Sequence, residues 1–421
     1  MMCNRFASQL IFVAVLGPAG LFSLTGCAPH DYKKEADEQV YRIIDQKWDP
    51  NFGTKANYKI SDTPPSPNDI QVSKEVTDFG ILTLPLAVAL ATAHNREYQN
   101  QREDLYIKAL DLRLTRHDFE TQFFGGGSAG YNADRNDGVA GAETNIGFNR
   151  LLAGGTRISA ELAGAWAEVL SGNLRSGLAS ILSFSVVQPL LRGSSRRVVL
   201  ENLTQAERDT LYQIRAFNRF RKEFVVSVVS QYYRVLQRLD AVKNARNNYA
   251  TLVRLGKSVE DLVGAGRLPL FEQQRIEQEI LQAENISSQA ETDYKQALDE
   301  FKITLSLPAT AQLELDETEF EALQQAGMTE PNLVEEKVIN AALAQRLDVA
   351  NSADAIIDAQ RKVYVATDSL RAEANIIGTT QATTARRADR RSLDWLREEY
   401  GLGVELDLAL DRVPEQTVYR A

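Results

Sequence analysis

The longest regular pattern in the sequence is that of an amphipathic helix. From residue 194 to about Leu262, apolar side chains recur at intervals of three and four, which places them on one helix face. At 1.5 Å per residue, these roughly 70 residues would extend on the order of 100 Å. Glycines and Pro269 interrupt the pattern at residues 263–269, and a second helical pattern follows to Leu307. The sequence therefore predicts one long antiparallel helical hairpin over residues 194–305.

A shorter helical pattern precedes the hairpin. Between residues 82 and 119 the apolar positions again recur at three and four, which predicts one helix or a broken pair. The long hairpin also carries large side chains that one partner helix cannot fully hide, namely Phe220, Phe224 and Tyr233. Because exposed apolar area is costly in water, we expect the chain to self-associate.

Between these helices the period changes to two, as in strands with one wet and one apolar face. Residues 145–151 and 156–166 flank a glycine-containing turn at residues 152–156. The polar positions of the strands are Arg157, Ser159, Glu161, Ser183 and Ser185, and the large apolar positions are Leu162, Trp166 and Phe184. Such alternation fits a soluble sandwich or a membrane barrel, and the pattern itself does not separate the two.

The sequence also contains an internal repeat. A shift of 251 residues places Leu82 on Leu333, Leu105 on Ile356 and Leu112 on Val363. A strand pattern at residues 403–410 and a helix start at residues 411–415 follow, and the second long hairpin that the repeat requires is absent up to residue 421. We therefore expect two repeats, residues 81–307 and 308–421, the second shortened after its strand.

The N-terminus has the features of an export signal. Arg5 precedes an apolar stretch over residues 10–24 that is too short to cross a bilayer comfortably. The stretch ends in Leu24-Thr25-Gly26-Cys27, which resembles a bacterial lipobox. Residues 1–26 would then be a lipoprotein signal peptide, and Cys27 would carry palmitate and diacylglycerol. An ordinary signal peptide with a chance cysteine is the alternative. Residues 27–80 are polar and proline-containing, which predicts a lipid-anchored tether with little regular structure.

Composition narrows the possible functions mainly by exclusion. The net charge is −10, from 47 Lys and Arg against 57 Asp and Glu, and this argues against nucleic-acid binding, which needs a basic surface. Two cysteines cannot build a disulfide framework, and three separated histidines give no zinc spacing. No motif of an activated nucleophile occurs. We therefore expect no catalytic residue, no cofactor and no metal, and the sequence indicates that the chain is not an enzyme.

Three charged or glycine-rich features have structural explanations. Gly125-Gly126-Gly127 lacks the lysine and the helix of a phosphate-binding loop, so these glycines are predicted to lie in a strand. The many acidic residues are interpreted as solvated helix faces. A basic cluster at residues 386–391 is predicted to be a solvated loop, with contact to anionic lipid headgroups as the alternative.

The order of these elements resembles that of a known family. A helix, strands, the segment Gln188-Pro189-Leu190-Leu191-Arg192-Gly193, a long hairpin, and then a repeated helix and strand resemble the TolC-like outer-membrane efflux proteins, lipoprotein branch. This resemblance implies an α+β membrane protein with outer-membrane β-barrel strands and long periplasmic α-helical hairpins that form a tunnel, built from an internal structural repeat and assembled as a homotrimer. The sequence departs from the family in showing one long hairpin.

The resemblance also implies a function. We expect an outer-membrane channel component of an efflux or type I secretion-like system, a passive duct whose lumen faces the polar strand positions and whose partners are a periplasmic adaptor, an inner-membrane pump and outer-membrane lipid. The hairpin tip would dock the adaptor through Gly264, Gly266, Arg267 and Leu268. The alternative is a lipid-anchored periplasmic coiled-coil scaffold without transport activity. Either protein would reside at the cell outer membrane and extend into the periplasm.

Overall fold

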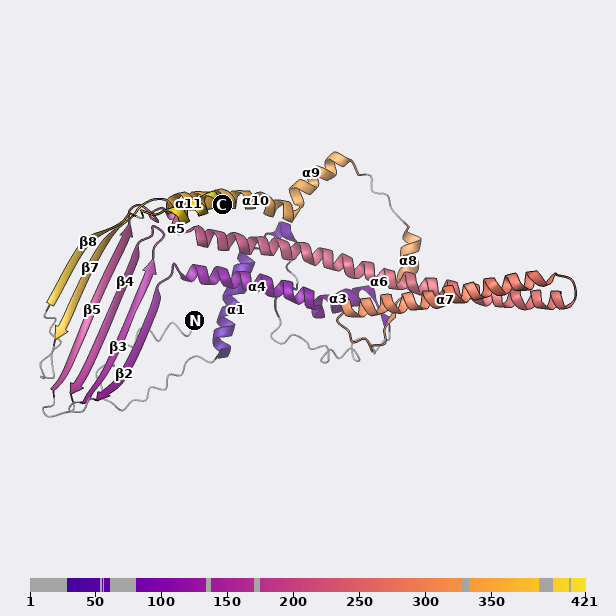
Figure 1. Cartoon of the computed structure of the whole chain (residues 1–421), viewed down its shortest axis with the longest axis horizontal. Helices are drawn as coiled ribbons and strands as arrows, with labels where there is room; N and C mark the ends of the chain where they lie inside the picture. The colour runs from indigo at the N-terminus through magenta and orange to yellow at the C-terminus, as the bar shows by residue number, and fades with distance from the viewer. Residues whose placement is uncertain are drawn as a thin grey trace.

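A curved sheet and a set of long helices make up the described part of the chain (Figure 1). The computed structural model describes residues 29–53, 55, 57–60, 81–133, 138–169, 175–327, 333–385, 397–408 and 410–421. The sheet lies at one end, and the helices extend from it to a hairpin tip at the other end.

Helix α6 (Glu201–Gly264) is the longest element, with 64 residues. Helix α7 (Leu270–Thr304) runs back from the tip along the distal part of α6, and helix α4 (Arg96–His117) covers the part nearer the sheet. Asn95 links α7 to α4. Its side-chain amide donates to the carbonyl of Thr304 in α7 at 2.9 Å, and its side-chain oxygen accepts from the amide of Tyr98 in α4 at 3.1 Å. The predicted hairpin therefore exists, but its second helix is shorter than the first.

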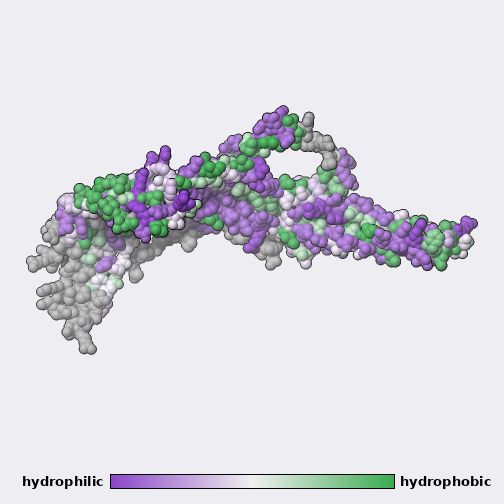
Figure 2. Space-filling view, turned by 45° about the horizontal axis from the view of Figure 1, so that its top comes forward, coloured by the Kyte–Doolittle hydropathy of each residue, from purple (hydrophilic) through white to green (hydrophobic). Residues whose placement is uncertain are grey.

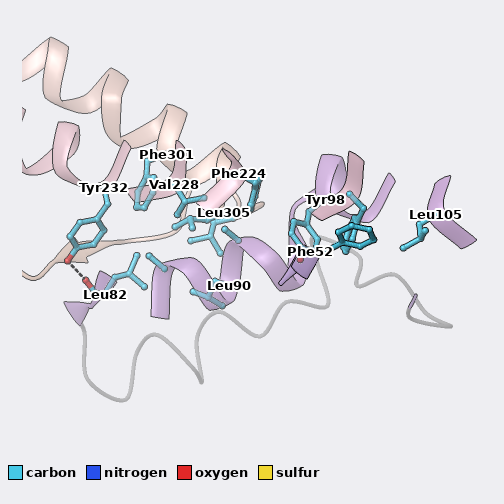
Figure 3. Close-up of a cluster of buried hydrophobic side chains, with 14 of the residues drawn as sticks. Phe52, Leu82, Leu90, Tyr98, Leu105, Phe224, Val228, Tyr232, Phe301 and Leu305 are labelled. Atoms are coloured by element: carbon cyan, nitrogen blue, oxygen red, sulfur yellow. Dashed lines mark hydrogen bonds between the residues drawn. The ribbon is translucent and has the colours of Figure 1, made fainter. Parts of the chain in front are cut away.

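The region predicted as one helix or a broken pair is a pair, α3 (Leu84–His94) and α4, separated at Asn95. Tyr98 of α4 contacts the rings of Phe217, Phe220 and Phe224, at centroid distances of 5.3 to 5.9 Å. Phe224 is buried (Figure 3). Phe220 and Tyr233 are partly buried against the same core, so their cover comes from within the chain and these three side chains do not by themselves require self-association. Helical periodicity showed which face is apolar, but it did not show which distant helix covers that face.

Helix α1 (Pro29–Lys47) overturns part of the tether prediction, which expected little regular structure here. Val40, Ile43 and Ile44 are buried in the common core, and α1 lies across α4 (Figure 1). The hydroxyl of Tyr106 donates to the carboxylate of Asp37. The short helix η2 (Pro50–Phe52) follows α1. Abundant charges around the three apolar positions hid the stripe, and the proline-rich residues 61–80 lie outside the described residues.

The large sheet is antiparallel, with six strands in the order β2-β3-β4-β5-β7-β8. Its strands are β2 (Gln122–Ala133), β3 (Gly138–Leu151), β4 (Arg157–Val169), β5 (Arg175–Pro189), β7 (Glu373–Ala385) and β8 (Arg397–Asp407). The strands predicted at residues 145–151 and 156–166 and the strand position of Gly125-Gly126-Gly127 are confirmed. The strand predicted at residues 403–410 is β8, which ends at Asp407. Strand β7 was missed, because its threonines and alanines give little contrast between the faces. Within the described residues, β2 and β8 are the edges of this sheet.

The repeat is visible in the element bounds. Helix α9 (Glu335–Gln345), helix α10 (Leu347–Ser369) and strand β7 begin at residues 335, 347 and 373, each 251 positions after α3, α4 and β2, which begin at residues 84, 96 and 122. The remaining elements are the paired strands β1 (Ile81–Leu82) and β6 (Glu314–Leu315) and the helices α5 (Arg196–Val199), α8 (Thr318–Ala326) and α11 (Val413–Arg420). The division at residue 307 stays a prediction.

The two repeats differ in how well their helices are covered. In α4, Leu105 and Leu112 are fully buried, whereas Ile356 and Val363 at the equivalent positions of α10 are 64% and 53% exposed. Figure 2 shows apolar surface along this side of the molecule, over α10 and α11. Helix α10 instead uses other residues to contact α6.

Candidate functional site

The register of the sheet brings the predicted polar residues together. Cross-strand partners in an antiparallel pair share a face. Ser159 pairs with Ser185, Glu161 pairs with Ser183, and Arg157 lies two residues before Ser159 on the same strand. All five therefore lie on one face of the sheet. Gln381 of β7 and Glu399 of β8 continue the row of Glu161 and Ser183, and sequence reasoning missed both because β7 and the start of β8 were not recognised.

The other face of the sheet is apolar and uncovered. Leu162 pairs with Leu182, and Phe184 pairs with Ala160, in the phase opposite to the polar row. Large side chains on this face are exposed within the described part of the chain, and they include Ile146, Leu162, Leu182, Phe184, Leu402 and Val404. A soluble sandwich would bury such a face against a second sheet. An exposed apolar face opposite a polar one is the pattern that the wall of a membrane barrel would have.

Side-chain contacts hold the polar face in place. The amide of Asn145 donates to the carboxylate of Glu161 at 3.1 Å, and the hydroxyl of Ser183 lies 3.4 Å from the carbonyl oxygen of the same residue. Glu143 lines a shallow groove on this face together with Asn145 and Glu161. The groove presents two carboxylates to solvent, so this part of the face is acidic.

The hairpin tip is a tight turn with exposed side chains. The amide of Arg267 donates to the carbonyl of Leu262 at 2.9 Å, which requires the positive φ of 68° that Gly266 adopts. Gly264, Gly266 and Arg267 are exposed, and Leu268 is half-buried. Leu270 and Phe271 are also exposed at the start of α7, and sequence reasoning had counted them as part of the second helix without noting their exposure. Residues 263–271 therefore present apolar side chains and one cation, Arg267.

A polar seam joins α6 to α10, and sequence reasoning missed it. Asp358 is buried, and its carboxylate receives contacts from Arg208 at 2.5 Å, Tyr212 at 2.6 Å and Arg361 at 2.8 Å. Arg361 also pairs with Glu201 of α6 at 3.0 Å. The interpretation of acidic residues as solvated helix faces is wrong for Asp358. The seam has a signal in the sequence, because polar residues recur after four and seven positions in both helices. They are Glu201, Gln205 and Arg208 in α6, and Asp354, Asp358 and Arg361 in α10.

The seam favours the ionised form of Asp358. Burial alone would raise the pKa of its carboxyl, but hydrogen bonds from Tyr212 and Gln205 and the charge of Arg208 outweigh burial and lower the pKa below the ordinary 3.8. Burial and the hydrogen bond to Asp358 together raise the pKa of the Tyr212 hydroxyl. The pair therefore stays in its folded protonation state at neutral pH.

Several predicted features lie outside the described residues. They are Cys27, the basic cluster at residues 386–391 and the side chain of Trp166. In the part of the chain that the structure describes, no cluster of three or more potential metal ligands occurs. None of the described helices is both long and apolar enough to cross a bilayer.

Solved structures with the same architecture settle the fold. The structure of CusC, a protein that forms a transmembrane channel, aligns with 80% of this chain over 68% of the CusC chain, with a TM-score of 0.52 at 13% sequence identity. The open MtrE outer-membrane channel of Neisseria gonorrhoeae matches 80% and 66%, with a TM-score of 0.51 at 11% identity. This chain has the TolC-like fold.

Other comparisons agree with this assignment or add nothing to it. The outer-membrane protein VceC of Vibrio cholerae matches 85% of this chain and 76% of its own, with a TM-score of 0.50 at 11% identity. No protein-family model and no curated sequence matches the chain. The TolC-like fold therefore rests on structure, and the predicted fold class is confirmed, while the sheet is not closed into a barrel within one chain.

Proposed function

We propose that this chain is the outer-membrane channel component of an efflux or type I secretion-like system. The observation that carries the proposal is the sheet with one polar and one apolar exposed face, at the end of long helices in the TolC-like fold. The apolar face would contact lipid, and the polar face would line a water-filled lumen.

The proposed duct is passive. Arg157, Ser159, Glu161, Ser183 and Ser185 would face the lumen, where polar side chains keep the passage hydrated for diffusing cargo. Diffusion needs no catalytic group, so an inner-membrane pump would supply the energy. The closing of the sheet would require further copies of the chain, and we propose a homotrimer.

The hairpin tip is the proposed contact for a periplasmic adaptor. It lies at the end of the molecule farthest from the sheet (Figure 1), so it is the part that would reach partners across the periplasm. Exposed Leu270 and Phe271 would supply buried apolar area in the contact, and Arg267 would donate to carbonyl oxygens of the adaptor. Gly264 would allow close approach of the two backbones.

The proposed attachment to the membrane has two parts, a lipid anchor at Cys27 and the sheet itself. A lipid anchor holds a protein at the membrane surface, and the strength of this attachment increases with the number of acyl chains. A closed barrel would instead span the bilayer. The two attachments can therefore be separated by removing the first.

The deciding experiment is Cys27→Ser in cells fed labelled palmitate, followed by alkaline carbonate extraction of outer membranes. We expect the variant to lose the label and to remain in the carbonate-resistant membrane fraction. Release of the unlabelled variant into the periplasmic fraction would refute the channel and favour the lipid-anchored scaffold. Equal labelling of variant and wild type would refute lipidation at Cys27.

A further inference from the structure

The two repeats differ by one β-hairpin. Strand β7 begins 251 residues after β2, and β8, like β5, is the strand that directly precedes a helix on the way out of the sheet. Between β2 and β5 the first repeat contains β3 and β4, whereas the described residues between β7 and β8 contain no strand. The β3–β4 hairpin is therefore the addition that distinguishes the first repeat from the second.

This hairpin is part of the sheet, and both faces continue through it. On the polar face, Asn149 of β3 pairs with Ser159 of β4, which pairs with Ser185 of β5. On the apolar face, Ile146 pairs with Leu162, which pairs with Leu182. A slip of one residue in the register would exchange the polar and apolar faces. The continuous faces therefore indicate that β3 and β4 belong to the wall of the sheet and do not fold over its end as a loop.

The added hairpin separates β2 from β5, although the helices attached to these two strands are in direct contact. Neighbouring strands lie about 4.8 Å apart, so β2 and β5 are separated by roughly 14 Å, whereas β7 and β8 are adjacent. Helices α4 and α6, which are attached to β2 and β5, nevertheless pack directly, with the hydroxyl of Thr210 donating to the carbonyl of Lys108 at 3.2 Å. The sheet therefore widens relative to the helical part.

The edges of the sheet allow copies to join without a break. Six antiparallel strands make β2 and β8 run in opposite directions, so β8 of one copy would pair antiparallel with β2 of the next. The two edges also match in length, with 12 and 11 residues. Each copy would then add an even number of strands to a closed ring, as barrels of this type require.

We propose that the β3–β4 hairpin is an inserted pair of wall strands that widens the barrel, so that its mouth admits cargo too bulky for a barrel with four strands per copy. The proposal rests on the proposed channel function. Barrel diameter grows roughly linearly with strand number. Removing two of six strands should narrow the barrel by about one third, whatever the number of copies in the ring.

The test deletes residues 138–169, which form β3, β4 and their turn. Strands β2 and β5 are antiparallel and would meet with Gln122 opposite Ser185, which keeps every remaining side chain on its present face. Wild type and deletion are compared in planar bilayers, where polyethylene glycols of graded size are added to the side opposite the helical tunnel. This geometry measures the mouth of the barrel and not a constriction in the tunnel.

We expect the radius of the largest polymer that enters to fall by about one third in the deletion, with an unchanged number of copies by mass in detergent. An unchanged cutoff would overturn the inference while leaving the channel function standing. Wild-type protein that forms no conducting channel would overturn the proposed function and the inference with it.

A second measurement decides the case in which the deletion does not assemble. Glu161→Cys and Leu162→Cys are adjacent on β4 and point to opposite faces. In the full chain, a charged, membrane-impermeant thiol reagent should reduce the current through Glu161→Cys and leave Leu162→Cys and wild type unchanged. If the reagent affected neither variant, or both equally, β4 would not be in the barrel wall and the inference would fall.

Discussion

At the scale of single residues, Asp358 is the buried carboxylate in the contact between α6 and α10. It is only 5% exposed and is bound by donors from both helices. In Asp358→Asn the shape is kept but the charge is lost, so Arg208 and Arg361 face a neutral group. We expect the free energy of local opening of α10, measured by hydrogen exchange, to fall by about 2–3 kcal/mol.

The matched control for this variant is Glu223→Gln on α6, where an exposed carboxylate pairs with Arg219 at 2.8 Å. A surface pair contributes less than about 1 kcal/mol. Equal effects of the two substitutions on α10 would mean that the seam is no stronger than a surface ion pair.

The seam also predicts a pH dependence. The pKa of Asp358 is lower in the folded chain than the ordinary 3.8, so its stabilising contribution is complete above that value and is lost as the pH falls through the lower folded value. We expect the thermal midpoint, followed by circular dichroism, to decline steeply below about pH 4. In Asp358→Asn this part of the decline should be smaller, and an identical profile would exclude Asp358 as its source.

Gly155 is a second residue with a sharp requirement. It lies in the turn between β3 and β4 with a φ of 82°, and an added Cβ would lie 2.5 Å from the carbonyl oxygen of Gly193 and 2.8 Å from Cγ of Pro189. Gly155→Ala should therefore destabilise the chain by at least about 1–2 kcal/mol. Gly154→Ala in the same turn meets open space and should have little effect. The two variants are compared by denaturant unfolding, and similar midpoints would contradict the strain argument.

At the scale of elements, α1 provides a test of whether the N-terminal segment belongs to the folded unit. Ile44 is fully buried, and Gln46 on the same helix is exposed. Ile44→Ala should lower the free energy of unfolding by about 2–4 kcal/mol because it leaves a cavity. Gln46→Ala should change it by less than about 0.5 kcal/mol. A flexible tether would respond equally weakly to both substitutions, as measured by chemical denaturation.

The elements also show what could be predicted from sequence and why the rest could not. Helix α6 and the alternation in β4 follow from local periodicity, which depends only on neighbouring residues. The hairpin tip followed from Gly266 and Pro269. The seam around Asp358 depends on two helices far apart in the chain, and a single sequence does not place them together. Helix α1 was not predicted for a different reason, since charged residues surround its three buried apolar positions and hide the amphipathic pattern.

At the scale of the whole molecule, uncovered surfaces predict association. In the described part of the chain, Ile356 and Val363 on α10 and the apolar side of the sheet are exposed, and the outer edges of β2 and β8 have no neighbouring strand. We expect light scattering of detergent-solubilised protein to give three times the mass of one chain. A monodisperse monomer at micromolar concentration would contradict both the trimer and the barrel.

The glycines of β2 have a consequence for the order of folding. The α6–α7 hairpin forms contacts across a short turn and should form early. The proposed barrel would close only later, because β8 of one copy would have to meet β2 of the next. Until then the edge of β2 is open to wrong partners. Gly125, Gly126 and Gly127 lower the strand propensity of this edge, so it is a poor template for nonspecific pairing. In the proposed assembly, β2 would therefore stay unpaired until β8 of a neighbouring copy reaches it.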